Sequence, residues 1–221
     1  MPKIISAEAA AELIQPGNRV SFGGFLAVGC AEKIVDALVN QGTKDLHMIA
    51  ISTDYEDKGV GKLIANNQVK SVQISHMGTN KATQNQMNNG TLEVELVPQG
   101  TLMERIRAKG AGLGGILTPT GVGTIIADGK EKFIIDNKEY ILEKAISADF
   151  AIIKAHKADK LGNLIYSKTA RNSNPIMAMG ADVTIVEVDE IVETGDISPE
   201  EIITPGIFVK YIVLGDSDGQ K

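Results

Sequence analysis

Short apolar runs rich in β-branched residues alternate with stretches of helical periodicity, and this alternation constrains the fold more than any other feature. Residues 19–22 (Arg-Val-Ser-Phe) predict a strand, and residues 32–39 then place Ile34, Ala37 and Leu38 at helical spacing. A strand, a helix and a second strand in this order indicate a crossover between parallel strands. We therefore predict an α/β fold with a mostly parallel sheet.

No internal repeat and no linker long enough to divide domains separates the predicted elements. The predicted helices cover residues 6–13, 32–39, 61–65, 81–87 and 102–108, and the predicted strands cover residues 19–22, 46–51, 69–75, 92–97, 150–153, 183–188 and 207–214. Asp-Asn-Lys at 136–138, between two apolar runs, predicts a β-hairpin. We predict a single domain over residues 1–215 and a frayed polar tail over residues 216–221.

Composition and charge argue against several classes of partner. Lys and Arg total 22 against 28 Asp and Glu, and the resulting net charge of −6 disfavours general nucleic-acid binding. No apolar run approaches the roughly 18 residues of a membrane span, and the N-terminus does not resemble a signal peptide. The three histidines and the one cysteine, Cys30, show no zinc-site spacing and allow no internal disulfide. We expect a cytoplasmic protein without a metal site that binds neither membranes nor nucleic acid.

A glycine-rich segment, residues 23–30 (Gly-Gly-Phe-Leu-Ala-Val-Gly-Cys), lies between a predicted strand and a predicted helix. Its backbone N–H groups can face a phosphate or a carbonyl oxygen of a ligand, helped by the dipole of the following helix. It can equally be a tight turn that needs glycine for its backbone geometry. The sequence alone weighs the two interpretations about equally.

Residues 110–115 (Gly-Ala-Gly-Leu-Gly-Gly) satisfy the dinucleotide-binding pattern G-x-G-x-x-G, but in the wrong context. That motif follows a strand and opens a helix. Here a predicted helix precedes it, and Pro119 interrupts the segment that follows. A flexible loop or a close approach of subunits is the better interpretation.

Gln99 follows a predicted strand and precedes a predicted helix. Its amide can donate to a carbonyl oxygen or a carboxylate, or Gln99 can simply begin the helix. No nucleophile is evident from spacing, because no histidine is placed to act as a base for Cys30. We expect Cys30 to be a small buried thiol.

A basic, amide-rich stretch runs from Lys154 to Asn174 and includes His156, Arg171 and Asn172. Such a stretch is usually a solvated face, but it can also bind phosphate or an acidic partner. The asparagine and serine residues among the charges slightly favour an interface.

Several segments together resemble the α subunit of the family I CoA-transferases, of the short-chain 3-oxoacid type that acts on acetate, butyrate or acetoacetate. The most specific segments are LEVELVPQGTLMERIR at 92–107, GAG at 110–112 and TPTGVGT at 118–124. GGF at 23–25, ADFA at 148–151 and TPG at 204–206 agree with them. The resemblance covers nearly the whole chain.

The resemblance implies an open, mostly parallel α/β sheet with helices on both faces, a fold shared with sugar-phosphate isomerases. It implies a homologous β subunit, usually in an α2β2 heterotetramer, and a role in short-chain fatty acid metabolism. It also implies that the nucleophilic glutamate lies in a Ser-Glu-Asn-Gly motif of the β subunit, a motif that this sequence lacks. Coenzyme A is then a substrate, and no permanently bound cofactor is implied.

The implied reaction is a double displacement. The glutamate attacks the acyl-CoA thioester to give a mixed anhydride, and the released CoA thiolate attacks that anhydride to give an enzyme–CoA thioester. A second carboxylic acid reverses the sequence and leaves as its CoA ester. Because a carboxylate is a poor nucleophile, the site must stabilise the developing oxyanion and exclude water.

The resemblance also assigns site residues. The CoA-binding residues are Gly24, Phe25, Leu26, Ala27, Val28, Gly29 and Cys30, with Leu26 and Ala31 standing where related subunits commonly have Gly and Pro. Gln99 matches an active-site glutamine that contacts the substrate carboxylate or the glutamate. Thr53, predicted as a substrate contact, replaces an asparagine and cannot present the same amide donor.

Two other functions stay open on the residues alone. A sugar-phosphate isomerase on the same fold needs an acid/base group and a phosphate loop within the chain, and neither can be assigned. A non-catalytic acyl-CoA-binding module would bind its ligand without a partner and show no turnover. The specific match over residues 92–124 favours the CoA-transferase.

Overall fold

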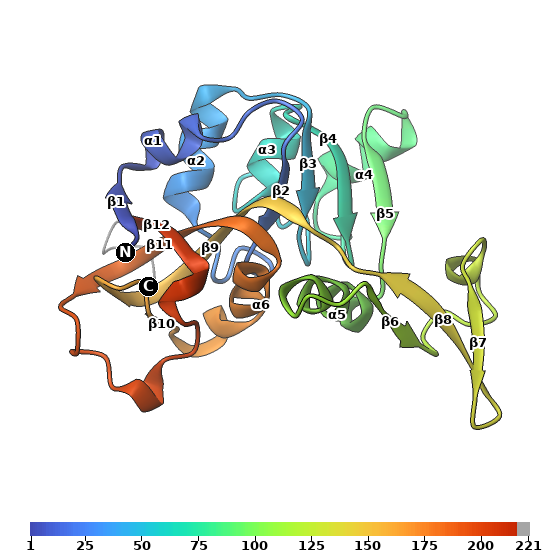
Figure 1. The fold of residues 1–221 in the computed structure, drawn as a ribbon. Helices are drawn as coiled ribbons and strands as arrows, with labels where there is room; N and C mark the ends of the chain where they lie inside the picture. Colours follow the sequence, from blue (N-terminus) through green and yellow to red (C-terminus); the bar gives the residue numbers. More distant parts are fainter. Residues whose placement is uncertain (216–221) are drawn as a thin grey trace.

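The computed structural model of the chain describes residues 1–215, which form one large sheet, flanking helices and a small second sheet (Figure 1). The large sheet has nine strands, β1 (Lys3–Ile5), β2 (Arg19–Phe22), β3 (Leu46–Ile49), β4 (Val69–Ile74), β5 (Glu93–Leu96), β9 (Ala148–Asp159), β10 (Leu164–Ile165), β11 (Ala181–Val192) and β12 (Val209–Leu214). They run in the order β1-β12-β11-β9-β2-β3-β4-β5, and β10 pairs with β9. Every pairing except that of β10 is parallel, which confirms the predicted sheet.

The helices agree with the predicted segments to within a few residues, apart from one that was not predicted. They are α1 (Ala7–Glu12), α2 (Glu32–Gln41), α3 (Gly61–Ala65), α4 (Lys81–Asn88), α5 (Gln99–Gly110) and α6 (Asn174–Met179). The hydroxyl of Ser6 accepts a hydrogen bond from the N–H of Ala9 and caps α1. Helix α6 escaped prediction because it is only six residues long and lies in the amide-rich stretch. Strand β1 was not predicted either, because it has only three residues and is held in place by its pairing with the distant strand β12.

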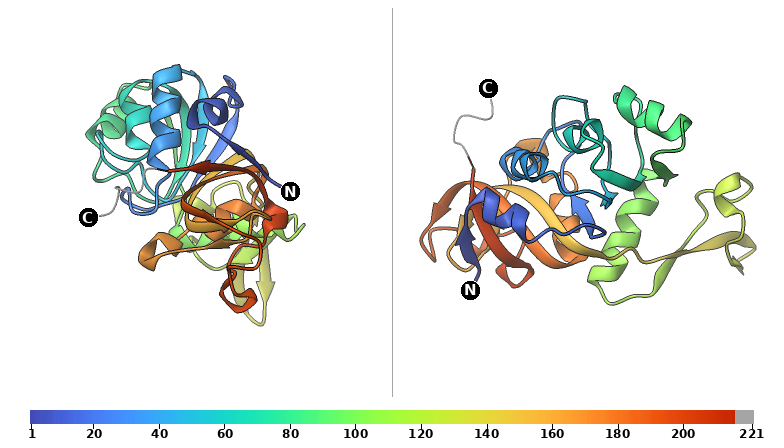
Figure 2. Two further views of the ribbon diagram at one scale, coloured as in Figure 1. Left: turned by 90° about the vertical axis from the view of Figure 1, so that its left-hand side faces the viewer. Right: turned by 90° about the horizontal axis from the view of Figure 1, so that it is seen from above.

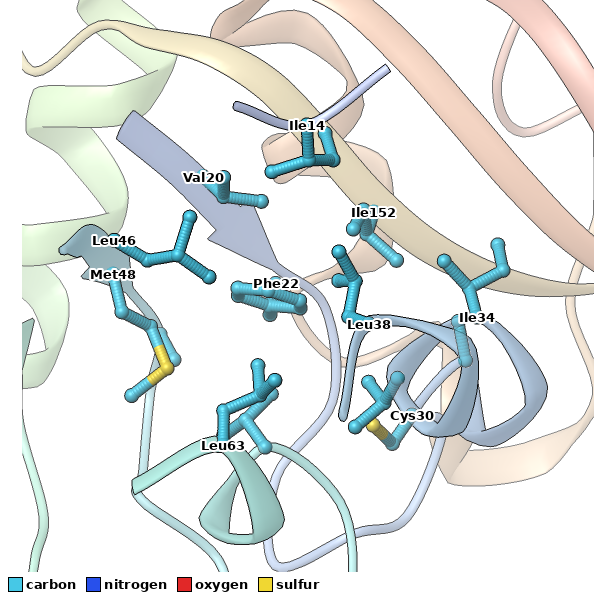
Figure 3. Close-up of a cluster of buried hydrophobic side chains, with 14 of the residues drawn as sticks. Ile14, Val20, Phe22, Cys30, Ile34, Leu38, Leu46, Met48, Leu63 and Ile152 are labelled. Carbon is cyan, nitrogen blue, oxygen red and sulfur yellow. The ribbon is translucent and has the colours of Figure 1, made fainter. Parts of the chain in front are cut away.

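Helices cover both faces of the sheet, as predicted. On one face, Phe22 of β2 packs in a cluster with Leu38 of α2 and Leu63 of α3 (Figure 3). On the other face, Leu102 of α5 and Met177 of α6 form a second cluster with side chains of β9 and β11. The two clusters share the central strands, so the sheet is buried from both sides as a parallel sheet requires.

A three-stranded antiparallel sheet extends from the main body as an arm (Figure 1, Figure 2). Its strands are β6 (Gly115–Thr118), β7 (Lys132–Ile135) and β8 (Lys138–Lys144), in the order β6-β8-β7. The hairpin of β7 and β8 is the predicted one, and Asp136 and Asn137 adopt the left-handed backbone that such a turn needs. Strand β6 was not predicted, because its glycine-rich surroundings favour a loop.

Large apolar side chains stay exposed on this arm. Ile134 of β7 is 78% exposed, and Ile125, in the connection between β6 and β7, is 86% exposed. Exposed apolar side chains gathered on a projecting element are typical of a surface that contacts another molecule.

The predicted tail, residues 216–221, lies outside the described residues. Within residues 1–215, no helix combines the length and the apolar character needed to cross a membrane. The assignment of these residues to a single domain stays a prediction.

Candidate active site

Four parallel strands, β2 to β5, end at the same edge of the sheet, which we call the carboxyl edge. The segments that follow them are the glycine loop (residues 23–30), Ser52-Thr53-Asp54, Ser75-His76 and Pro98-Gln99. Open α/β sheets bind their ligands where the strands end. The structure therefore brings the glycine loop, Gln99 and the segment that contains Thr53 to one edge of the sheet.

The glycine loop reaches solvent only at its tip. Phe25 and Val28 exchange backbone hydrogen bonds of 3.1 and 3.0 Å across a two-residue turn, and their side chains are exposed. The turn residues Leu26 and Ala27 have φ of 51° and 66°, a left-handed conformation that costs a residue with a side chain about 1 kcal/mol or more. Of the residues predicted to contact CoA, the tip 25–28 is accessible.

The remaining three residues of the predicted CoA contact, Gly24, Gly29 and Cys30, are buried in the chain. The Cys30 side chain is 6% exposed and packs with Ile34 and Leu38 in the core (Figure 3). Burial raises the pKa of the thiol well above its usual value. Cys30 is thus the buried thiol expected from the sequence, and its side chain does not face the edge.

Asn174 of α6 holds the glycine loop in place through hydrogen bonds. Its side chain is fully buried, donates to the carbonyl oxygen of Gly29 at 3.0 Å, and accepts from the N–H of Lys154 at 2.9 Å. A Cβ added at Gly23 would lie only 1.7 Å from the Asn174 Oδ1 atom. Glycine is required at position 23 by this close approach.

Two neighbours of Asn174 complete this support. The Gly24 N–H donates to the buried hydroxyl of Ser173 at 3.1 Å, and the Asn172 amide donates to the carbonyl oxygen of Val28 at 3.0 Å. The segment 172–174, at the end of the basic, amide-rich stretch, therefore binds the chain's own glycine loop.

A second set of contacts connects the glycine loop to the segment after β3. The Leu26 N–H donates to the hydroxyl of Ser52 at 3.1 Å, and that hydroxyl donates to Asp54 at 2.6 Å. Asp54 also accepts from the N–H of Val60 at 3.1 Å. Burial raises the pKa of Asp54, although hydrogen bonds from Ser52 and from the backbone of Ala27 and Val60 act to lower it. Sequence analysis assigned no role to Ser52 or Asp54, the two neighbours of Thr53.

Gln99 is exposed at the first position of α5, where its side chain meets Ser75. The Ser75 hydroxyl lies 2.5 Å from Gln99 Oε1 and 2.9 Å from the carbonyl oxygen of Ile51. The ring of His76, next to Ser75, meets the ring of Phe25 edge to face with centroids 6.3 Å apart. Gln99 and the tip of the glycine loop are thus joined through one short stretch after β4.

Thr53 lies beneath this surface. Its side chain is fully buried, and its Oγ1 atom has no hydrogen-bond partner. Its backbone is held on both sides, since its N–H donates to the carbonyl oxygen of His76 and its own carbonyl oxygen accepts from Asn80. The predicted contact of Thr53 with substrate stays a prediction, and in this chain its side chain does not reach the edge.

Three side chains of the basic stretch, Lys154, His156 and Lys157, are paired with acidic residues of β11. Lys154, which is buried, contacts Glu187 at 3.2 Å and Asp189 at 2.6 Å, and His156 contacts Asp189 at 3.0 Å. Although burial acts to raise it, the pKa of Asp189 is lowered by hydrogen bonds from Lys154 and His156. Lys157 pairs with Glu190 in the same way. The part of the stretch that lies on β9 therefore belongs to the sheet, and its charges are paired within the chain.

The carboxyl edge thus offers hydrogen-bond donors and an apolar tip, while Asp54 has its oxygens occupied by the chain's own donors. Among residues 1–215, no group of three or more His, Cys, Asp or Glu side chains is placed to hold a metal ion. These features are typical of an α/β protein whose ligand site lies at the carboxyl edge of its parallel strands.

The family of the chain follows from comparison with known proteins. The family model for coenzyme A transferase matches residues 4–215, and the chain belongs to this family. It is similar to the acetate CoA-transferase subunit alpha of Escherichia coli K12, with 46% identity over 96% of each chain. It is also similar to the acetoacetyl-CoA:acetate/butyrate CoA transferase alpha subunit of Clostridium acetobutylicum, with 46% identity over 96% of this chain and 97% of the relative.

A solved structure confirms the fold class. An acyl-CoA transferase of E. coli O157:H7, crystallised as a thioester complex with CoA, superposes with a TM-score of 0.86 at 21% identity. The match covers 97% of this chain but only 47% of that protein, so the chain spans about half the length of that transferase.

Proposed function

We propose that this CoA-transferase chain is the α subunit of a heteromeric enzyme, cytoplasmic and of α2β2 composition. The enzyme moves CoA between a short-chain acyl-CoA or 3-oxoacyl-CoA and a carboxylic acid, namely acetate, butyrate or acetoacetate. Support comes from the relatives named as alpha subunits, whose names include acetate, butyrate and acetoacetyl-CoA.

The observation on which the proposal rests is the composition of the carboxyl edge. It gathers an exposed amide, Gln99, and an exposed apolar tip at Phe25 and Val28, while Asp54 is buried and already hydrogen-bonded. The carboxyl edge can therefore bind a substrate, but the nucleophile must come from another subunit. We assign that nucleophile to a glutamate of the β subunit.

In this mechanism the glutamate carboxylate attacks the thioester carbonyl carbon, and the C–S bond breaks to release CoA thiolate and leave a mixed anhydride. The thiolate then attacks the glutamyl carbonyl carbon, releasing the first carboxylate and forming an enzyme–CoA thioester. The second carboxylate attacks this thioester, which releases the thiolate and forms a second mixed anhydride. The thiolate then attacks the acyl carbon of that anhydride, which gives the new acyl-CoA and restores the glutamate carboxylate. Coenzyme A is a substrate throughout.

The residues of this chain bind and orient the substrates. We assign the contact with CoA to the tip of the glycine loop, residues 25–28, because the flanking Gly24, Gly29 and Cys30 are buried. We assign the contact with the reacting carboxylate or the oxyanion to the amide of Gln99. Donors that are held in place before the reaction stabilise developing negative charge at little reorganisation cost.

The test is CoA transfer from acetoacetyl-CoA to acetate or butyrate, measured with the purified chain alone and with a co-expressed β subunit from the same organism. We expect activity only from the complex, and none when the glutamate of the β subunit is changed to glutamine. Activity of the isolated chain would contradict the proposal, because it would require a nucleophile within this chain. Light scattering of the complex would test the α2β2 composition.

A further inference from the structure

We propose that Ser75 is a positioning residue that decides which end of the Gln99 amide faces the substrate. This inference rests on the role proposed above for Gln99 and names the residue on which that role depends. It follows from the hydrogen-bond donors and acceptors that meet where β4 ends.

The Ser75 hydroxyl has one proton and two candidate acceptors. The first acceptor, the carbonyl oxygen of Ile51, already accepts from the backbone N–H groups of Ser75 and His76, both at 3.0 Å. A carbonyl oxygen has two lone pairs, so both are in use. The second acceptor, Gln99 Oε1, lies closer, at 2.5 Å against 2.9 Å. The proton therefore goes to Gln99.

This hydrogen bond fixes the orientation of the amide. Because Gln99 Oε1 is held by Ser75, the Nε2 group with its two N–H donors is the end left for a ligand. Two donors suit a carboxylate or the oxyanion of an attacked thioester. A flipped amide would instead present lone pairs to a negative group and repel it.

The position of Ser75 is itself well fixed. Its N–H and that of His76 both donate to the carbonyl oxygen of Ile51, two residues after β3, and the His76 ring contacts the ring of Phe25. Gln99 lies at the N-terminal end of α5, a twelve-residue helix, where the helix dipole also favours negative charge. Ser75 thus connects the exposed side chain of Gln99 to a backbone position that is fixed by the sheet.

The kinetic test is a double-mutant cycle in the complex with the β subunit, with Ser75→Ala and Gln99→Ala alone and together. We expect Ser75→Ala to lower kcat/KM for the carboxylate about tenfold, as the loss of one orienting hydrogen bond would. In the Gln99→Ala background the same change should have less than a twofold effect. Ser75→Thr, which keeps the hydroxyl, should retain most of the activity.

Ser71→Ala is the matched control, because Ser71 lies at the other end of β4 and bonds to His47 at 2.7 Å. It should leave kcat/KM unchanged. Equal losses from Ser75→Ala in both backgrounds would overturn the inference, since Ser75 would then act independently of Gln99. No loss from Gln99→Ala alone would contradict the role proposed for Gln99.

A second measurement does not depend on activity. The side-chain amide of Gln99 in the ¹⁵N-labelled chain can be assigned by its absence from Gln99→Ala, and its ps–ns order followed by NMR relaxation. We expect order in the wild type and in Ser75→Thr, and a clear loss of order in Ser75→Ala. Equal mobility in all three would overturn the inference. An inactive wild-type complex would contradict the proposed function, while this comparison would still decide whether Ser75 orients Gln99.

Discussion

At the scale of single residues, the burial of Thr53 bears on its predicted contact with substrate. The resemblance to CoA-transferases implied a substrate contact for Thr53, but its side chain is fully buried and its Oγ1 atom has no hydrogen-bond partner. A buried hydroxyl without a partner costs free energy that an apolar group of the same shape would not. Thr53 therefore carries a local cost to stability.

Thr53→Val should raise the free energy of unfolding by about 1 kcal/mol, because valine keeps the shape and removes the unpaired hydroxyl. Urea titration of the chain would measure this. The matched control is Thr184→Val: the Thr184 hydroxyl is equally buried but donates to the carbonyl oxygen of Ala178 at 2.9 Å, so its loss should destabilise by about 1 kcal/mol. Destabilisation by both changes would mean that the Thr53 hydroxyl has a hydrogen-bond partner. A raised KM of the complex that carries Thr53→Val would support the predicted substrate contact.

At the scale of elements, the loop after β2 is shaped by a distant helix. Asn174 of α6 holds the Gly29 carbonyl oxygen and also the backbone of Lys154 on β9. The same side chain passes so close to Gly23 that no Cβ fits there. The conformation of the glycine loop therefore depends on the packing of α6 against the sheet.

Gly23→Ala should lower the free energy of unfolding by about 3 kcal/mol, since the methyl group must displace a buried, hydrogen-bonded amide. Gly114→Ala is the control, because a Cβ at Gly114 meets no atom within 4 Å and its backbone is not left-handed. That change should alter stability by no more than about 0.5 kcal/mol. Denaturant titration of both variants compares them directly, and equal stabilities would contradict the role given to Asn174.

At the scale of the whole molecule, one sheet connects the two hydrophobic clusters. Strands β9, β11 and β12 contribute Ile152, Ile185 and Val213 to the cluster under α1 to α3. The neighbouring residues Ile153 and Val186 point to the opposite cluster under α5 and α6. Because the two clusters share their strands, disruption of the packing in one cluster displaces strands that also carry side chains of the other.

Leu63→Ala and Leu102→Ala, one in each cluster, should each lower the free energy of unfolding by about 3 kcal/mol and shift a single common transition. The chain has no tryptophan, so far-UV circular dichroism and tyrosine fluorescence are the suitable probes. Coincident transitions would support the predicted single domain over residues 1–215. Two separate transitions, each moved by one variant, would contradict it.

The sequence by itself determined the features that depend on neighbouring residues. Alternating strand and helix periodicity predicted the parallel sheet and most of its helices, and Asp136 and Asn137 predicted the hairpin of the arm. The resemblance over residues 92–124 indicated the family that comparison then showed. It also drew attention to Gln99, which lies where the predicted strand meets the predicted helix.

Only the tertiary structure decided how the site is held together. Glu187 of β11 accepts from the N–H of Ile34 in the first turn of α2, Asn174 supports the glycine loop, and Ser75 binds Gln99. These partners are separated by 153, 145 and 24 residues. Local periodicity and turn chemistry act over a few residues, whereas such contacts form only when strands from distant parts of the chain become neighbours in one sheet.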